Sequence, residues 1–164
     1  MGHIHFIQPE ERYIRSYWET FDRIAKEKKY LASEEAFPFD STVQFINRSI
    51  RRGFPQIFII DRDTDVCVGW CDALPKTDEV GYLGMGLLPE YREHGIGTQV
   101  LRAIIEKCRK FGYKKIELDV LKSNSRAIHV YEKAGFEQVA LITGGFQCRN
   151  TLIKEDVIQM SLEL

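Results

Sequence analysis

Residues 84–98 read Gly84-Met-Gly-Leu-Leu-Pro-Glu-Tyr-Arg-Glu-His-Gly-Ile-Gly-Thr98. This stretch contains the end of a β-rich run, a sharp turn and the start of a helical pattern. Within Arg92-x-x-Gly95-x-Gly97 the glycines lack a Cβ, so consecutive backbone N–H groups can point at one anion while the helix dipole adds positive potential. Neither the Walker Lys-Ser/Thr pair nor the G-x-G-x-x-G dinucleotide spacing is present. The stretch predicts a pyrophosphate-binding turn for a ligand other than ATP or NAD.

The residues on both sides of this turn predict an α/β fold. Three β-rich runs precede it, at residues 57–61, 66–74 and 80–88, and short turns join them into an antiparallel meander. A helix over residues 95–111 follows it and ends at Gly112. The turn therefore joins the last strand of the meander to a helix.

The rest of the chain adds strands and helices at each end. Strands are expected at residues 3–8, 115–121, 136–143 and 156–162, and helices at residues 10–29, 40–52 and 124–134. The second of these helices starts at a segment that resembles a capping box, Asp40 to Gln44, and its Val43, Ile46 and Ile50 are expected to face inward. This order predicts a single-domain mixed, mostly antiparallel sheet with helices on both faces.

Composition and charge exclude several classes of protein. The chain has 164 residues, of which 44% are hydrophobic and 29% charged, as expected of one globular domain. Its net charge of -1 provides no positive field to hold a nucleic-acid backbone. No apolar run suits a signal peptide or reaches the ~20 residues of a membrane span. We expect a cytoplasmic protein that binds neither nucleic acid nor membrane.

The cysteines and histidines are not spaced as metal ligands. The chain has 4 cysteines without a C-x-x-C pair, and Cys67 and Cys71 are followed by no partner pair at zinc-site separation. His94 and His129 lie far apart in sequence. We expect reduced thiols, including Cys148, and no metal site.

Two segments of the chain resemble the GNAT superfamily of N-acetyltransferases. Residues 88–97, Leu-Pro-Glu-Tyr-Arg-Glu-His-Gly-Ile-Gly, resemble motif A, whose loop grips the pyrophosphate of CoA. Residues 124–136, Asn-Ser-Arg-Ala-Ile-His-Val-Tyr-Glu-Lys-Ala-Gly-Phe, resemble motif B. The resemblance covers residues 66–164 well. It implies one N-acetyltransferase domain over residues 1–164, with acetyl-CoA as cosubstrate and an amine that attacks the thioester directly.

The resemblance also implies which residues bind the cosubstrate. Backbone N–H groups at the end of the strand before the turn would hold pantetheine and polarise the thioester carbonyl, and those of the turn would hold pyrophosphate. Asn124 would contact the pantetheine arm, although it also suits the N-cap of a helix. The implied cosubstrate-binding residues are Leu87, Leu88, Arg92, Glu93, His94, Gly95, Ile96, Gly97, Thr98 and Asn124.

The transfer of the acetyl group requires two proton transfers, for which we expect side chains. Tyr131 matches a tyrosine that the family places near the CoA sulfur, where a phenol could protonate the departing thiolate. An amine of pKa near 10 must also lose a proton before it attacks. Glu34, Glu35 and Asp72 are the candidate bases, and we prefer Glu35 because the loop at residues 37–39 resembles, in position, one that overlies the acceptor site.

Some features stay open at this level. The chain departs from the common family pattern at Glu93, where Gly is frequent, and at Tyr82, where many relatives carry a glutamate that could serve as base. The acceptor is a small-molecule or a peptide amine. The alternative to an enzyme is a regulatory module that binds CoA without turnover. A homodimer through sheet edges is a further possibility.

Overall fold

A computed structural model describes residues 2–147 and 154–164. Its strands form one sheet in the order β1-β2-β3-β4-β5-β7-β6. The strands are β1 (Ile4–Ile7), β2 (Gln56–Asp61), β3 (Val66–Pro75), β4 (Val80–Leu87), β5 (Lys115–Leu121), β6 (Glu137–Gln147) and β7 (Lys154–Glu163). In the described ranges, β4 and β5 pair in parallel and the other neighbours pair antiparallel. The predicted mixed, mostly antiparallel sheet is confirmed.

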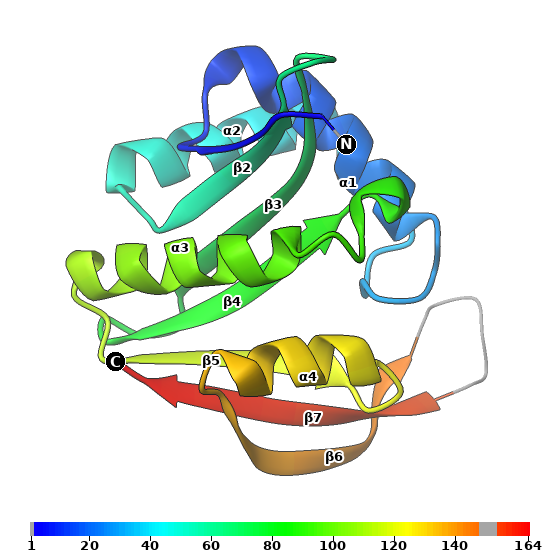
Figure 1. Ribbon diagram of the computed structural model, residues 1–164, viewed down its shortest axis with the longest axis vertical. Coiled ribbons are helices and arrows are strands. Elements are labelled where there is room, and N and C mark those ends of the chain that lie inside the picture. The colour runs from blue at the N-terminus through cyan, green and yellow to red at the C-terminus, as the bar shows by residue number, and fades with distance from the viewer. Residues whose placement is uncertain (1, 148–153) are drawn as a thin grey trace.

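Helices cover both faces of this sheet. They are α1 (Ile14–Ala25), α2 (Phe39–Arg52), α3 (Ile96–Phe111) and α4 (Ser125–Lys133), with the short 3-10 turns η1 (Glu11–Tyr13) and η2 (Pro89–Tyr91). Figure 1 shows α3 and α4 in front of the sheet, and α1 and α2 behind it. The two layers bury β2 on both sides, so its run Ile57-Phe-Ile-Ile60 lies at the centre of the core.

The second helix differs from its prediction at both ends. Pro38, whose φ of -51° and ψ of 137° are extended, precedes Phe39, and no side chain caps the helix. The predicted capping box is therefore wrong. Ile50 is 46% exposed, and Ser49 is buried in its place. The buried residues Thr42, Ile46 and Ser49 follow one another at spacings of four and three and form one stripe, and Ile50 lies at the edge of that stripe.

Two findings bear on membranes and metals. No helix in residues 2–147 or 154–164 is long and apolar enough to cross a membrane. Over the same residues, no group of three or more His, Cys, Asp or Glu side chains could hold a metal ion. Cys67, Cys71 and Cys108 are buried free thiols, and Cys148 lies outside the described residues.

Candidate functional site

The strands β4 and β5 separate halfway along their length. They pair at Val80, Gly81 and Tyr82, and no pair is recorded between them beyond Tyr82. On its other side β4 stays paired with β3 as far as Leu87. Where one strand of a parallel pair turns away, the backbone N–H and C=O groups of the other strand that faced it lose their partners and are exposed. The carboxyl half of β4 thus has a backbone edge open toward β5.

The register of β3 and β4 identifies which N–H groups face this gap. Leu88 donates its N–H to the Val68 carbonyl at 3.0 Å, so this group is already bonded to β3. Along two antiparallel strands, residue pairs that exchange two backbone hydrogen bonds alternate with pairs that exchange none. The N–H groups of Leu87 and Met85 therefore point away from β3, toward the gap. Met85 was missed from the sequence, because the direction of a strand N–H depends on the register with its partner.

The loop at residues 92–98 presents a row of N–H donors at the start of α3. Within the described part of the chain, the N–H groups of residues 93–98 make no hydrogen bond, whereas that of Arg92 donates to the Pro89 carbonyl. Gly95 has a φ of 78°, which turns the chain into α3. An added Cβ at Gly97 would meet only Met85 Cε, at 4.0 Å. The donors are therefore unpaired and Gly97 is open to a close approach, and the helix dipole makes this place attractive to an anion.

The Arg92 side chain holds this loop in place. Its guanidinium donates to both carboxylate oxygens of Glu27, at 2.9 and 2.7 Å, and its Nε donates to the Leu87 carbonyl at 2.8 Å. The ring of Tyr30 lies 5.2 Å below the guanidinium carbon. A bidentate, partly buried pair fixes geometry well. Arg92 thus joins β4, the loop and the segment after α1.

Glu93 adopts a conformation that explains why glycine suits its position. Its φ is 66°, in the left-handed region that most side chains avoid. Its carboxylate pairs with Arg126 at 2.6 Å on the exposed surface. The loop therefore carries a carboxylate next to the row of N–H donors, partly compensated by Arg126.

We expect Glu93→Gln to tighten the binding of CoA several-fold at low ionic strength. The variant keeps the backbone and removes a charge that repels phosphate, and salt screens such a repulsion. Isothermal titration of CoA at low and high salt measures the effect. An affinity gain that persists unchanged at high salt would contradict the electrostatic explanation.

Tyr131 lies on α4 and Asn124 directly precedes this helix, across the gap from β4. The Asn124 side chain accepts a hydrogen bond from the Ala127 N–H at 3.3 Å, so it is the N-cap of the helix. Tyr131 is buried, and its ring packs edge-on against Phe136. Burial raises the pKa of Tyr131, and nearby Cys71 raises it further. No described residue hydrogen-bonds its hydroxyl, which is free to meet a ligand.

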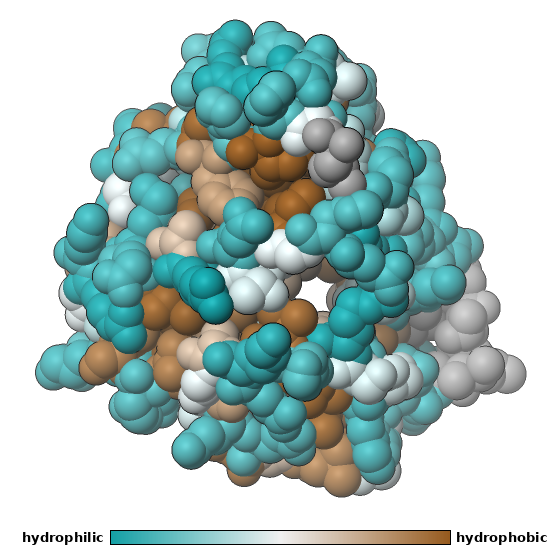
Figure 2. All heavy atoms as spheres, viewed as in Figure 1, coloured by the Kyte–Doolittle hydropathy of each residue, from teal (hydrophilic) through white to brown (hydrophobic). Residues whose placement is uncertain are grey.

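An opening passes through the molecule beside these residues. Figure 2 shows it between the N-terminal end of α3 and α4, where Figure 1 places the diverging carboxyl ends of β4 and β5. The loop of N–H donors lies on the front face, with α3 and α4. A ligand bound to this loop could therefore reach the rear face of the sheet through the gap.

A cavity of about 390 Å³ lies on the rear face, between β3, α1 and α2. We call it the acceptor pocket, for the role that is proposed for it. It is mostly apolar and contains one carboxyl group, that of Asp72. Its lining consists of Tyr17, Phe21, Phe37, Ser41, Thr42, Phe45, Trp70, Asp72 and Leu74.

Asp72 lies next to the open strand β4. It pairs with Gly84, and a Cβ built on Gly84 would come within 3.2 Å of the Asp72 Oδ1. The Trp70 ring similarly covers Gly86, where a Cβ would come within 2.3 Å of the indole. Glycines at these positions let the two β3 side chains reach over β4 toward the gap. Burial raises the pKa of Asp72 to about 7, although the nearby Gln56 side chain and the Gly84 N–H lower it in part.

The other predicted bases lie elsewhere. Glu35 is exposed and does not line the acceptor pocket, and neither does Glu34. Tyr82 donates its hydroxyl to Asp119 at 2.8 Å, across β4 and β5 at the point where they part. Asp72, on the neighbouring strand and the same face as Tyr82, is the one of the three predicted bases that lines the acceptor pocket.

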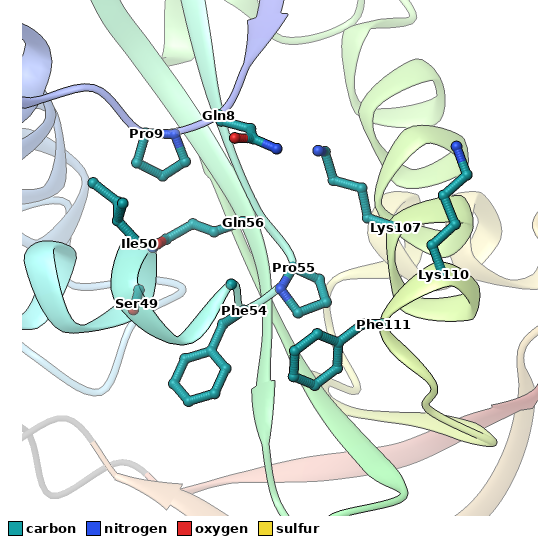
Figure 3. Close-up of a pocket in the computed structure, with 11 residues that line it drawn as sticks. Gln8, Pro9, Ser49, Ile50, Phe54, Pro55, Gln56, Lys107, Lys110 and Phe111 are labelled. Atoms are coloured by element: carbon teal, nitrogen blue, oxygen red, sulfur yellow. The ribbon is translucent and has the colours of Figure 1, made fainter.

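Another cavity, of about 340 Å³, lies far from this gap. Figure 3 shows Lys107, Lys110 and Phe111 of α3 on one side of it and the end of α2 on the other. Since α3 has 16 residues, its C-terminal end is roughly 24 Å from the loop at its N-terminus. This cavity does not adjoin the loop at residues 92–98, although Gln56 in its lining pairs with Asp72.

Residues 11–136 match the protein family described as Acetyltransferase (GNAT) family. Among curated relatives, an Escherichia coli (strain K12) [ribosomal protein bS18]-alanine N-acetyltransferase is 29% identical over 87 residues, covering 53% of this chain and 57% of that protein. An N-alpha-acetyltransferase of Sulfurisphaera tokodaii is 34% identical over 71 residues, 42% of each protein. The chain thus spans about half the length of the curated relatives that it matches.

Solved structures share the fold at low identity. An acetyltransferase of the GNAT family from Streptococcus pneumoniae has a TM-score of 0.89 at 16% identity, covering 99% of both chains. A GNAT superfamily phosphinothricin acetyltransferase from Sinorhizobium meliloti, in complex with acetyl-CoA, has a TM-score of 0.87 at 16% identity, covering 98% of this chain and 88% of that one. These similarities concern the arrangement of elements.

Proposed function

The chain belongs to the GNAT acetyltransferase family, and on that premise we propose that it transfers an acetyl group from acetyl-CoA to a primary amine of a small molecule or peptide. The observation that carries the proposal is the row of free N–H groups at residues 93–98, next to a gap that leads through the sheet. One N-acetyltransferase domain, working in the cytoplasm, is the arrangement we propose for residues 1–164.

The residues at the loop and the gap fit acetyl-CoA. The loop offers consecutive donors, a helix N-terminus and glycines that let a pyrophosphate approach closely. The gap between β4 and β5 offers a backbone edge to which the amide groups of a pantetheine arm can bond as an added strand would. Asn124 can add its amide N–H₂, since its carbonyl oxygen is used in the helix cap. The Thr98 hydroxyl remains a proposed phosphate contact.

Acetyl-CoA supplies a thioester, whose carbonyl carbon accepts the amine and whose sulfur departs. One of the two N–H groups of Met85 and Leu87 donates to the carbonyl oxygen, where negative charge develops, and the other is left for the pantetheine arm. Asp72 takes the proton of the ammonium from the rear face, leaving a neutral amine to form the C–N bond. Tyr131 gives its phenolic proton to sulfur as the C–S bond breaks. The nitrogen loses its second proton to solvent as the amide forms, Tyr131 regains a proton from solvent, and Asp72 releases its own to solvent. The products are an amide and CoA thiol.

Asp72 replaces Glu35 as the proposed base for two reasons. It lies beside the strand whose N–H groups face the thioester, whereas Glu35 is exposed. Its raised pKa, about 7, lets it take a proton near neutral pH. Tyr82 of β4 stands where many relatives carry a glutamate. Asp72 provides a carboxylate one strand away, on the same face of the sheet.

We expect Tyr131→Phe to lower kcat by about 10²- to 10⁴-fold while CoA affinity stays unchanged. The phenylalanine ring keeps the packing against Phe136, so the fold should persist. Burial also disfavours a thiolate, so the sulfur needs a proton from a group that stays protonated at pH 7. Thiol release from acetyl-CoA with a panel of amines, together with the melting temperature, measures the effect.

The same assay separates an enzyme from a regulatory module. Acetyl-CoA binding without thiol release, for any amine in the panel, would favour a CoA-binding module and overturn the proposed activity. Full turnover in a stable Tyr131→Phe variant would leave the activity standing and remove Tyr131 from the mechanism.

A further inference from the structure

The acceptor pocket is built of aromatic rings that hold one another in place. Tyr17 stacks on Phe58, with ring centroids 4.8 Å apart, and meets Trp70 edge-on at 5.7 Å. Phe21 lies 5.2 Å from Trp70 and 6.1 Å from Phe37. Rings fixed in this way lose little side-chain entropy when an apolar group binds between them.

Phe37 is the outermost of these rings, and the backbone around it is anchored. Its side chain is 60% exposed. Its carbonyl accepts a hydrogen bond from Trp18 Nε1 at 2.7 Å, and the preceding Ala36 N–H donates to Asp22 Oδ1 at 2.9 Å. An exposed aromatic ring on a fixed segment, at the rim of an apolar cavity, is suited to contact a ligand.

The charge in the pocket fits one ammonium group. Asp72 is the carboxylate in the lining, and it is 7% exposed. A second ammonium in the same cavity would lie among aromatic and aliphatic side chains without a carboxylate partner, which is costly when the group is buried. A polyamine is therefore a poor fit.

The polar groups of the pocket are also too few for a peptide. In a peptide acceptor, each residue has a backbone C=O and, except for proline, a backbone N–H. These groups need hydrogen-bond partners when they are buried. Beyond Asp72, the lining side chains offer the Tyr17 phenol, the Trp70 indole N–H and the hydroxyls of Ser41 and Thr42. An apolar body attached to the amine needs none of these partners.

We propose that the acceptor is a primary monoamine carried by a compact aromatic or apolar group, with the ammonium on Asp72 and the body between the rings of the acceptor pocket. This inference rests on the proposed function and specifies its substrate class. The amine then lies over Gly84, on the side of β4 from which it can reach the gap.

The test is a set of titrations of three amines into the protein saturated with CoA. The amines are 2-phenylethylamine, spermidine and a tripeptide with an N-terminal alanine. We expect 2-phenylethylamine to bind at least tenfold more tightly than the other two. Phe37→Ala should weaken its binding about tenfold, because the variant removes one aromatic contact. Phe111→Ala is the matched control, since Phe111 is also exposed but lies outside the acceptor pocket, and it should leave binding unchanged.

Binding and turnover give separate answers. Tighter binding of spermidine or the peptide, or equal effects of the two Phe→Ala variants, overturns the inference while leaving acetyl transfer intact. Selective binding of 2-phenylethylamine without its acetylation, when acetyl-CoA is bound, overturns the proposed function and supports the pocket. Selective binding followed by acetylation supports both.

Discussion

Asp72→Asn is expected to lower kcat/KM by about 10²- to 10⁴-fold and, at pH 8, to make the protein more stable. Activity falls because the amide cannot take the proton of the ammonium or pair with its charge. In the wild type, kcat/KM should rise with pH through about 7 as Asp72 loses its proton, and the variant should lose this dependence.

The gain in stability follows from the raised pKa of Asp72. Burial holds the pKa of this carboxyl at about 7 in the folded protein, above its ordinary value of 3.8. The folded state then binds more protons than the unfolded state between these values, so the free energy of unfolding decreases as pH rises from about 4 to 7. The full penalty, on the order of a few kcal/mol, applies above pH 7. Asparagine is never charged and avoids it.

Melting curves and rates at pH 4, 6 and 8 test both expectations. Glu35→Gln provides the comparison, because it removes an exposed carboxylate from the loop beside the acceptor pocket. We expect it to keep the rate, the pH profile and the stability of the wild type. A loss of activity in Glu35→Gln with normal turnover in Asp72→Asn would return the role of base to Glu35.

Gly95→Asp is expected to weaken CoA binding by at least about 100-fold. Gly95 has a φ of 78°, where a side chain is strained, and its N–H belongs to the row that is proposed to bind the pyrophosphate. The substitution also places a carboxylate against the pyrophosphate. Repulsion in a partly dry site and displacement of the loop act in the same direction.

Two controls separate these causes. Gly53→Asp introduces the same residue at a φ of 66°, also in open space, but at the end of α2 away from the loop. We expect it to cost stability without changing CoA affinity. Gly95→Asn keeps the size and removes the charge, so the difference between the two Gly95 variants measures the repulsion. Unchanged CoA affinity in a folded Gly95→Asp protein would exclude the 92–98 loop as the phosphate site.

Local sequence patterns predicted most elements of the fold. Alternation and three-to-four spacing placed the strands and helices close to their observed bounds, and β5 was predicted at Lys115–Leu121, where the structure has it. The errors were also local. Pro38 starts α2 without a side-chain cap, and Ser49 takes the buried place expected for Ile50. Helix ends and single turns depend on contacts that periodicity does not describe.

The candidate site was predicted in part. The glycines of the loop indicated an anion-binding turn, because a missing Cβ is a property of single residues, and the resemblance pointed to Tyr131. The sequence offered Asp72 among three carboxylates without a reason to choose it. It offered no sign that Arg92 holds Glu27 and the Leu87 carbonyl and so positions the loop.

By itself, then, the sequence determined the order of elements and the mixed sheet and predicted an anion-binding turn at the start of α3, since each follows from neighbouring residues. Only the tertiary structure decided where β4 leaves β5, which N–H groups of β4 face the gap, and that Asp72 lies beside Gly84 in an aromatic pocket. These features join residues distant in the chain, through the register of three strands and the packing of α1 and α2 over them. Local preferences carry no information on such a register, because it is fixed by the burial of whole strand faces.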